Sequence, residues 1–355
     1  MKNKRLYING ISSISAQLGN EVFEGIVTTY HQNIIPAVSQ NYKEFIEPMA
    51  LRRMSRGIKM GITAAKIALN EADINKPEAI ITGTGEGCKQ DTDKFLEAIL
   101  NQDEKLLTPT AFIQSTHNTI GGQLALNFEC TGYNVTYTQN SASFESALID
   151  AQLLFLEQPY LNSVLVGGVD ELSEKTTLFM FLDKQLKEKE ISNLDLLIKD
   201  SPGTITSEGA HFFSISAEKL DKTYAELTDV SIFQAKTSEE VSEKILKVLQ
   251  LNNLDIKDIG AVILGNNGDN RFDNFYHHLQ NEIFSEKTQL AYKHLTGDYK
   301  TVSGYGFWLA CKLFKTGSIP EILKLNAVTC QNPKIILIYN QYLGENHSIM
   351  ILNSN

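Results

Sequence analysis

Cysteine, proline and tryptophan are scarce in this chain, whose 355 residues include 4 cysteines, 8 prolines and 1 tryptophan. The cysteines at positions 88, 130, 311 and 330 lie far apart in the sequence. They lack the paired spacing that is typical of a zinc site or a disulfide framework. We therefore expect reduced, mostly buried thiols.

Long apolar runs and basic clusters are also missing. The longest apolar stretches, such as residues 335–339, are far too short to cross a bilayer, and residues 1–10 lack the apolar core of a secretory signal. Acidic residues outnumber basic ones by 42 to 32, and no basic block could follow a phosphate backbone. The sequence predicts a soluble, cytoplasmic protein that binds neither nucleic acid nor membrane.

The chain does contain a regular alternation of helical and strand patterns. Apolar side chains at helical spacing predict one long amphipathic helix over residues 49–72, and residues 79–85 follow as a buried strand. Residues 241–249 and 261–265 repeat this plan, so we expect an internal duplication. Further strands are predicted at 133–138, 163–167, 335–339 and 348–352, with helices at 142–157 and 302–315.

This alternation predicts an α/β fold in which helices cover sheets. No linker rich in proline, glycine or serine divides the chain. The most polar stretch, residues 183–200, is interpreted as an exposed connection rather than a domain break. We expect one compact unit made of two halves, residues 1–220 and residues 221–355.

The glycine-rich residues 82–87 look superficially like a nucleotide-binding loop. They lack the Gly-Lys-Ser/Thr ending of a loop that binds phosphates and the glycine spacing of a dinucleotide-binding fold. Close packing of a strand against a helix is the better explanation.

Residues 132–148 contain the most informative change of pattern. β-Branched and aromatic residues give way to small residues and then to an apolar helical pattern. Ser141 is predicted where a strand turns into a helix, and backbone N–H groups at such a point can stabilise an anion or a carbonyl oxygen. In an alternative interpretation, Ser141 or Ser143 simply caps the helix.

Residues 132–148 and 164–171 together resemble the nucleophile region of β-ketoacyl-carrier-protein synthases. The arginine–methionine segment at 50–56 and the Glu-Gly-Ala turn that begins at Glu208 resemble further signals of that family. The resemblance covers roughly residues 45–352 in order. It implies a thiolase-like fold, in which two duplicated βαβ halves form a layered α-β-α-β-α core.

The resemblance also implies which residues stand at the catalytic positions. In that family a cysteine takes the acyl chain, and two histidines donate hydrogen bonds to the thioester oxygen; Ser141, Asn267 and Asp298 occupy these positions here. Lys293 matches the family's lysine. A serine hydroxyl needs a neighbouring base, and an ionised Asp298 would repel developing negative charge. We therefore expect decarboxylative condensation to be largely lost.

His117, Phe144 and Glu208 complete the candidate site as substrate-binding residues. If the fold brought His117 to Ser141, the two would form a Ser–His pair, with Glu208 or Asp298 orienting the imidazole. A plainer interpretation makes His117 a hydrogen-bonded helix or interface residue. No metal site is expected.

Two functions remain open at this stage. In the first, the chain is a condensation-inactive partner of an active ketosynthase in fatty-acid or polyketide/polyene biosynthesis, as chain-length factors of the family are. Those factors often carry glutamine at the cysteine position, whereas Gln139 here lies two residues earlier. In the second, the chain is an acyltransferase or a thioesterase-like enzyme with Ser141 as acyl acceptor, although the sequence names no convincing base.

The resemblance implies the molecules that the chain would meet. An acyl carrier protein is expected, together with a second subunit in either a homodimer or a heterodimer with an active ketosynthase. No bound cofactor is expected. The 4′-phosphopantetheine arm of the carrier protein would bring the acyl group.

Overall fold

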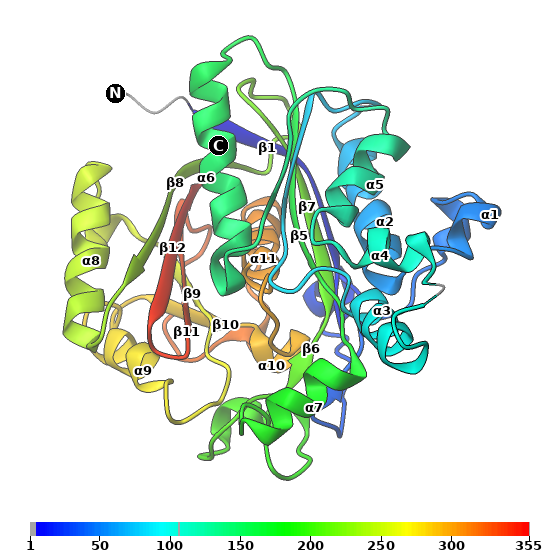
Figure 1. Ribbon diagram of the computed structural model, residues 1–355. Helices are drawn as coiled ribbons and strands as arrows, with labels where there is room; N and C mark the ends of the chain where they lie inside the picture. Colours follow the sequence, from blue (N-terminus) through cyan, green and yellow to red (C-terminus); the bar gives the residue numbers. More distant parts are fainter. Residues whose placement is uncertain (1–4, 106, 355) are drawn as a thin grey trace.

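The computed structural model describes residues 5–105 and 107–354, and residues 1–4 of the amino-terminal segment considered above lie outside this part. Hydrogen bonds join ten of its strands into one sheet (Figure 1). These strands are β1 (Leu6–Ile14), β3 (Ala79–Gly83), β4 (Asn134–Tyr137), β5 (Val164–Asp170), β7 (Gly209–Ser216), β8 (Ala225–Gln234), β9 (Ala261–Leu264), β10 (Thr288–Ala291), β11 (Ile335–Tyr342) and β12 (Asn346–Asn353). Two short strands, β2 (Ile34–Ile35) and β6 (Thr206–Ser207), pair separately.

The large sheet consists of two groups of five strands with the same internal order. The first group runs β4-β3-β5-β7-β1 and the second β10-β9-β11-β12-β8, and antiparallel pairing of β1 with β8 joins them. In each group three parallel strands are followed by two antiparallel ones. The chain passes from one group to the other between β7 and β8. A boundary at residue 220 stays a prediction.

Helices cover both groups of strands and fill the space between them (Figure 1). α2 (Arg56–Glu71) and α5 (Thr119–Asn127) cover the outer face of the first group, and α8 (Ser238–Leu251) and α9 (Asn274–Asn281) cover that of the second. α6 (Ser143–Glu157) and α11 (Ser303–Thr316) lie between the groups. This α-β-α-β-α arrangement confirms the predicted thiolase-like fold.

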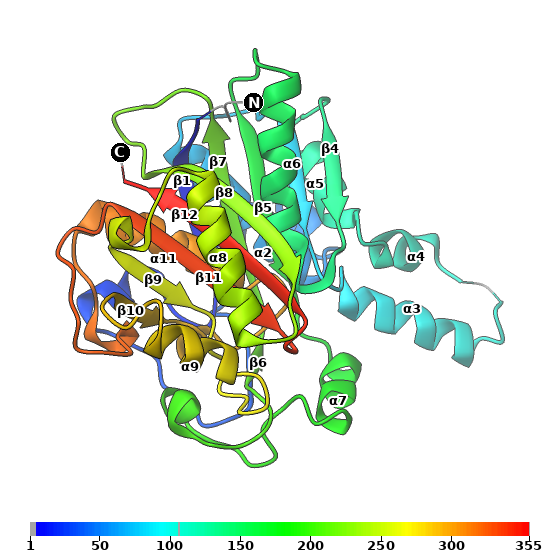
Figure 2. The same ribbon diagram turned by 90° about the vertical axis from the view of Figure 1, so that its left-hand side faces the viewer.

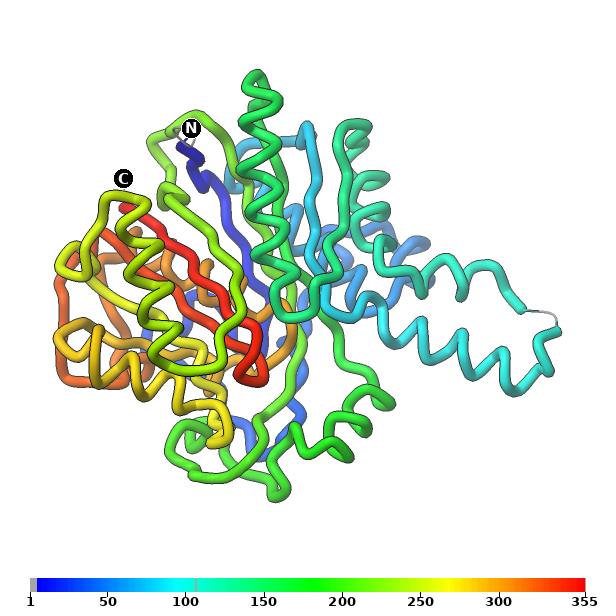
Figure 3. Tube along the Cα trace, turned by 60° about the vertical axis from the view of Figure 1, so that its left-hand side comes forward, coloured from blue at the N-terminus to red at the C-terminus, as the bar shows by residue number. Residues whose placement is uncertain are grey.

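The remaining helices lie outside these layers. They are α1 (Pro48–Leu51), α3 (Lys89–Asn101), α4 (Pro109–Ser115), α7 (Glu174–Leu182) and α10 (Lys293–Thr296). α3 and α4 pack on each other and form an arm that projects from the body (Figures 2 and 3). No helix in the described part of the chain is long and apolar enough to cross a membrane.

β7 shows how the sequence builds a sheet that is covered on both faces. All eight of its residues are buried, because helices cover both of its sides. Neighbouring side chains of a strand point to opposite faces. Phe212 accordingly joins the core beneath α2, whereas Phe213 joins the central core with Phe144 and Phe307.

One predicted helix proved to be two. Residues 49–72 form α1 and α2, and Ser55 separates them with an extended backbone. The Ser55 hydroxyl accepts a hydrogen bond from the N–H of Ile58 at 3.4 Å and so caps α2. The apolar spacing continues across this break, and for that reason the sequence pattern did not reveal it.

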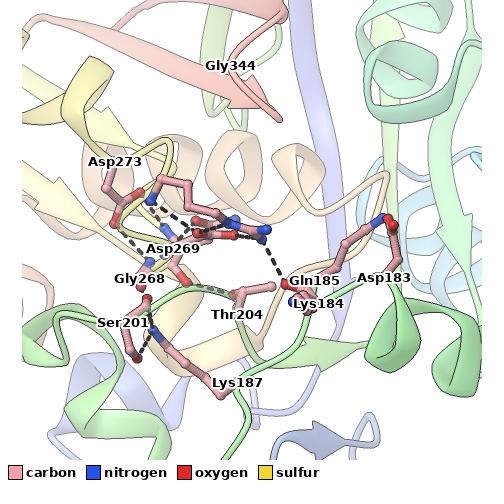
Figure 4. A network of polar contacts seen from close by, with 12 residues as sticks. Asp183, Lys184, Gln185, Lys187, Ser201, Thr204, Gly268, Asp269, Asp273 and Gly344 are labelled. Carbon is pink, nitrogen blue, oxygen red and sulfur yellow. Dashed lines mark hydrogen bonds and ion pairs between the residues drawn. The ribbon is translucent and has the colours of Figure 1, made fainter.

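Residues 183–200 are more buried than predicted. Lys187 is only 2% exposed, and its ammonium group donates to the backbone oxygens of Gly268 at 2.6 Å and Ser201 at 2.7 Å (Figure 4). Burial lowers the pKa of Lys187, and nearby Asp269 and Asp273 act in the opposite direction. The segment is therefore pinned to the loop after β9, which corrects the prediction of an exposed connection.

The cysteines agree with the sequence prediction. Cys88, Cys130 and Cys311 are buried and Cys330 is partly buried, and all four are free thiols. Burial raises the pKa of Cys88 to about 12, with smaller effects from neighbouring groups.

Candidate functional site

Ser141 lies where the sequence places it, between a strand and a helix. The chain leaves β4, passes through Asn140 with a φ of 53°, and enters a short 3-10 turn, η3 (Asn140–Ala142), followed by α6. A Cβ atom on Gly83 of β3 would lie 2.5 Å from the backbone carbonyl of Ser143. The absence of a side chain at Gly83 thus lets the start of α6 lie directly on the sheet, which confirms the packing explanation for residues 82–87.

Two serines near this turn have different surroundings. The Ser143 hydroxyl accepts a hydrogen bond from the N–H of Gln139 at 2.9 Å and donates to the backbone oxygen of Asn140 at 2.6 Å. No side chain caps η3 or α6, so neither serine is an N-cap. Within the described residues the Ser141 hydroxyl has no hydrogen-bond partner.

The four residues at the predicted catalytic positions line one cavity. Ser141, Asn267, Lys293 and Asp298 come from η3, the loop after β9, α10 and the loop after α10. The cavity holds about 1010 Å³ of empty space, including its opening to solvent. α7 and the turn between β11 and β12 also contribute to its wall.

Asp298 is held by the two other second-half residues. The Lys293 ammonium lies 2.9 Å from one carboxylate oxygen of Asp298, and the Asn267 side-chain amide donates to the other at 2.8 Å. Lys293 therefore offsets the negative charge of Asp298, which the sequence analysis expected to repel developing negative charge. Lys293 and Asn267 both direct their side-chain donors to Asp298 instead of leaving them free for a ligand in the cavity.

The loop after β9 fixes the position of Asn267. The Asp273 carboxylate accepts hydrogen bonds from the N–H group of Gly268 at 2.9 Å (Figure 4) and from that of Asn267 at 3.3 Å. Burial raises the pKa of Asp273 to about 6, although these N–H groups lower it. The Thr204 hydroxyl also donates to the backbone oxygen of Asn267 at 2.7 Å.

Two acids at the end of β5 line the first-half side of the cavity. Asp170 accepts hydrogen bonds from the N–H and hydroxyl of Thr301, at 2.9 and 2.8 Å, and from the hydroxyl of Thr84 at 3.0 Å. Glu171 accepts from the N–H groups of Gly57 at 2.6 Å and Gln90 at 2.9 Å. Burial raises the pKa of Asp170 to about 6 and that of Glu171 to about 7.

The sequence of this chain was compared with known protein families. Residues 29–178 match the family model described as the N-terminal domain of beta-ketoacyl synthases. This part of the chain is therefore similar to the N-terminal domain of that family. No curated protein sequence matches it.

Several solved structures superpose on nearly the whole length of this chain. A β-ketoacyl synthase from Burkholderia phymatum superposes with a TM-score of 0.83 at 15% identity, covering 99% of this chain and 100% of the other. The ishigamide ketosynthase/chain length factor gives 0.80 at 15%, with the same coverage. A ketosynthase in complex with its chain length factor from Xenorhabdus doucetiae gives 0.75 at 16%, covering 99% and 98%. Because the sequence identities are low, these superpositions show a shared fold and nothing more.

His117 makes no hydrogen bond to Ser141 within the described residues. It is exposed, lies against Gly87 and does not line the cavity. His347 does line the cavity, but its two ring nitrogens lie 2.9 Å from the Tyr339 hydroxyl and 3.1 Å from the backbone oxygen of Ala235. Within the described residues, neither histidine is hydrogen-bonded to the Ser141 hydroxyl.

Phe144 and Glu208 also lie outside the cavity wall. Phe144 is fully buried in the central core, with its ring centroid 5.6 Å from that of Phe213. Glu208 is buried, forms an ion pair with the partly exposed Arg56 at 2.5 Å and accepts a hydrogen bond from the N–H of Leu172 at 3.1 Å. A role in substrate binding for these two residues and for His117 stays a prediction.

Sequence reasoning missed Glu145. This residue is completely buried on α6, and its carboxyl group accepts a hydrogen bond from the Ser348 hydroxyl at 2.8 Å. Burial raises its pKa, and Ser348, Ser303 and Lys293 act in the opposite direction. An acid within the apolar helical pattern at 142–157 was the signal that could have drawn attention to it.

Proposed function

We propose that this chain is a condensation-inactive partner of an active ketosynthase in fatty-acid or polyketide/polyene biosynthesis, comparable to a chain length factor. The proposal depends mainly on the hydrogen bonds that the side chains at the three predicted catalytic positions make or lack. No base among the described residues is hydrogen-bonded to the Ser141 hydroxyl, and the Asn267 side chain donates a hydrogen bond to Asp298. Solved structures with this fold include ketosynthases paired with chain length factors.

The chemistry supports this proposal in two steps. A serine hydroxyl is a weak nucleophile unless a neighbouring base takes its proton, and no described residue stands in that position. Condensation also needs donors aimed at the oxygen that becomes negative, whereas Asn267 and Lys293 both point at Asp298. Both the acyl-transfer and the decarboxylation step therefore lack their groups.

We place the partner ketosynthase along β4. This strand ends the large sheet and, among the described strands, pairs only with β3, so its other edge is open to a further strand. Large apolar side chains are exposed around it, including Tyr133 beside β4 and Leu153 and Leu156 on α6. An exposed apolar surface next to an open edge favours association with another protein.

The projecting arm extends this surface. α3 and α4 reach away from the body near β4, and Phe112 and Ile113 of α4 are exposed (Figures 2 and 3). The Phe95 and Phe112 rings pack with centroids 5.5 Å apart and stiffen the arm. We propose that the arm lies against the partner ketosynthase.

The second proposed partner is an acyl carrier protein. Another structure with this fold is a type II polyketide synthase acyl-carrier protein in complex with its ketosynthase bound to the hexaketide, with a TM-score of 0.76 at 15% identity, covering 99% and 100% of the two chains. Here the 4′-phosphopantetheine arm of a carrier would deliver acyl chains to the assembled pair. The chain would need no cofactor of its own.

Co-expression with a cysteine-bearing ketosynthase tests the proposal. We expect a heterodimer in size-exclusion chromatography and, after incubation with acyl-carrier protein, an acyl adduct on the ketosynthase alone by intact-mass analysis. Leu153→Glu should separate the subunits, whereas the control Leu246→Glu, on the distant helix α8, should not. An adduct on this chain that disappears in Ser141→Ala would overturn the proposal, as would condensation by this chain on its own.

A further inference from the structure

A groove outside the candidate site lies between α4, α5 and the residues that lead into β4. It holds about 1240 Å³ of empty space, including its opening to solvent. None of the described residues in its wall belongs to the cavity around Ser141. The residues that shape it are Ile113 of α4, Gly122, Ala125 and Leu126 of α5, and Cys130 and Thr131 before β4.

Gly122 leaves space in this groove that the fold of the chain does not need. A Cβ atom at this position would meet no atom within 4 Å outside its own stretch of helix. At the preceding Gly121, by contrast, a Cβ atom would lie 2.9 Å from the Thr136 hydroxyl oxygen, so close packing on β4 requires that glycine. Glycine inside a helix is less favourable than alanine. No contact within the described part of the chain explains this cost at Gly122, whereas a partner that approaches closely would explain it.

The walls of the groove include exposed apolar side chains. Ile113 and Leu126, which both line it, are 59% and 74% exposed. The charged residues of its described wall are Lys76 and Glu129, whose charges are opposite. A strongly charged ligand is therefore disfavoured. An apolar segment of another protein would cover side chains that are now in contact with water.

The groove adjoins the open edge of β4. Cys130 and Thr131 line it, and β4 begins three residues after Thr131, at Asn134. A strand advances about 3.3 Å per residue, so the groove begins within about 10 Å of β4. Another part of its wall comes from α4 of the projecting arm, which packs on α5 (Figure 2). A ketosynthase that pairs with β4 and contacts the arm therefore passes over the groove.

We propose that this groove receives an apolar segment of the partner ketosynthase, and that Gly122 keeps the space open for it. The inference rests on the proposed function for the identity of the partner. It adds the surface that receives the partner, the apolar chemistry of the segment that fills it and the residue that must stay small.

Variants that fill the groove test this inference. In Gly122→Phe the ring would occupy the groove, and the melting temperature of the chain should not fall, because the position is open. We expect its affinity for the cysteine-bearing ketosynthase, measured by biolayer interferometry, to fall about tenfold or more, and that of Gly122→Ala to fall much less. The control Gln250→Phe adds the same ring at an exposed position of the distant helix α8 and should retain the affinity.

A heterodimer that forms equally well with Gly122→Phe would overturn this inference and leave the proposed function standing. A large drop in the melting temperature of Gly122→Phe would also overturn it, because the space would then belong to the fold of the chain. A wild-type homodimer that Gly122→Phe breaks apart would overturn it as well, since the occupant would be a second copy of this chain. If the wild-type chain does not bind the ketosynthase, both the proposed function and this inference are refuted.

Discussion

The two sides of the cavity hold their buried acids by different means. On the first-half side, Asp170 and Glu171 accept hydrogen bonds from backbone N–H groups and hydroxyls, without an ion pair in the described part of the chain. On the second-half side, Asp298 pairs with Lys293 and Asp269 with Arg271. The acids that line the first-half side have neutral donors alone, whereas those on the second-half side each have a cation, with the Asn267 amide as a further donor to Asp298.

This difference predicts that the two sides of the cavity respond differently to pH and to mutation. Neutral donors compensate a buried charge only in part, so burial raises the pKa of Asp170 and Glu171. Those acids should make stability depend on pH. An ion pair instead makes each member depend on the other, because removing one leaves an uncompensated buried charge.

Lys293→Met should have the largest effect. The Lys293 and Asp298 side chains are 5% and 13% exposed, so the variant leaves a buried carboxylate without its cation. We expect a loss of about 3–5 kcal/mol in the free energy of unfolding. Urea denaturation measures it. Lys324→Met, whose partner Glu321 is exposed, is the control and should lose less than about 1 kcal/mol. If Lys293→Met lowers the free energy of unfolding no more than Lys324→Met does, the proposed dependence of Asp298 on Lys293 is wrong.

Glu171→Gln should reduce the pH dependence of stability. Burial raises the pKa of Glu171 to about 7, so between its ordinary value of about 4.3 and about 7 the folded state binds more protons than the unfolded state. The free energy of unfolding therefore falls as pH rises through this window. The variant should remove a slope of at most about 1.4 kcal/mol per pH unit. Denaturant midpoints measured between pH 5 and pH 7 check this, with the exposed Glu345→Gln as control; an unchanged slope would contradict it.

The sequence predicted the fold best where patterns were long and regular. α8 and α11 follow clear apolar spacing, and β11 and β12 are rich in isoleucine. β1 was missed because asparagine, glycine and serine interrupt its pattern. β10 has four residues and is too short to show one. Both are strands only because their neighbours supply the hydrogen bonds.

The sequence predicted which residues form the candidate site, but it did not predict the hydrogen bonds and the ion pair among them. Family resemblance named Ser141, Asn267, Lys293 and Asp298, and the structure places all four on one cavity. The contacts of Asp298 depend on two loops and a helix meeting in space, which no local pattern encodes. The catalytic roles attached to these positions stay predictions.

Ser143→Ala should have a moderate effect on stability. Its hydroxyl accepts a hydrogen bond from the N–H of Gln139, and its one hydrogen is shared between the backbone oxygens of Asn140 at 2.6 Å and Thr84 at 3.0 Å. The variant removes these hydrogen bonds from the start of α6, including the buried one to Thr84, and we expect a cost of about 1–3 kcal/mol. Urea denaturation measures it, and a change within experimental error would show that the turn holds without this serine.

Ser141→Ala should change stability least, by less than about 0.5 kcal/mol, because its hydroxyl has no partner among the described residues. Its neighbour Ser143 is the matched control, since both serines lie in the same turn and lose the same atom. A cost for Ser141→Ala equal to that of Ser143→Ala would mean that Ser141 has a structural bond. If the cost is small, Ser141 is dispensable for the fold, and an acyl adduct that needs this residue would then report chemistry rather than folding.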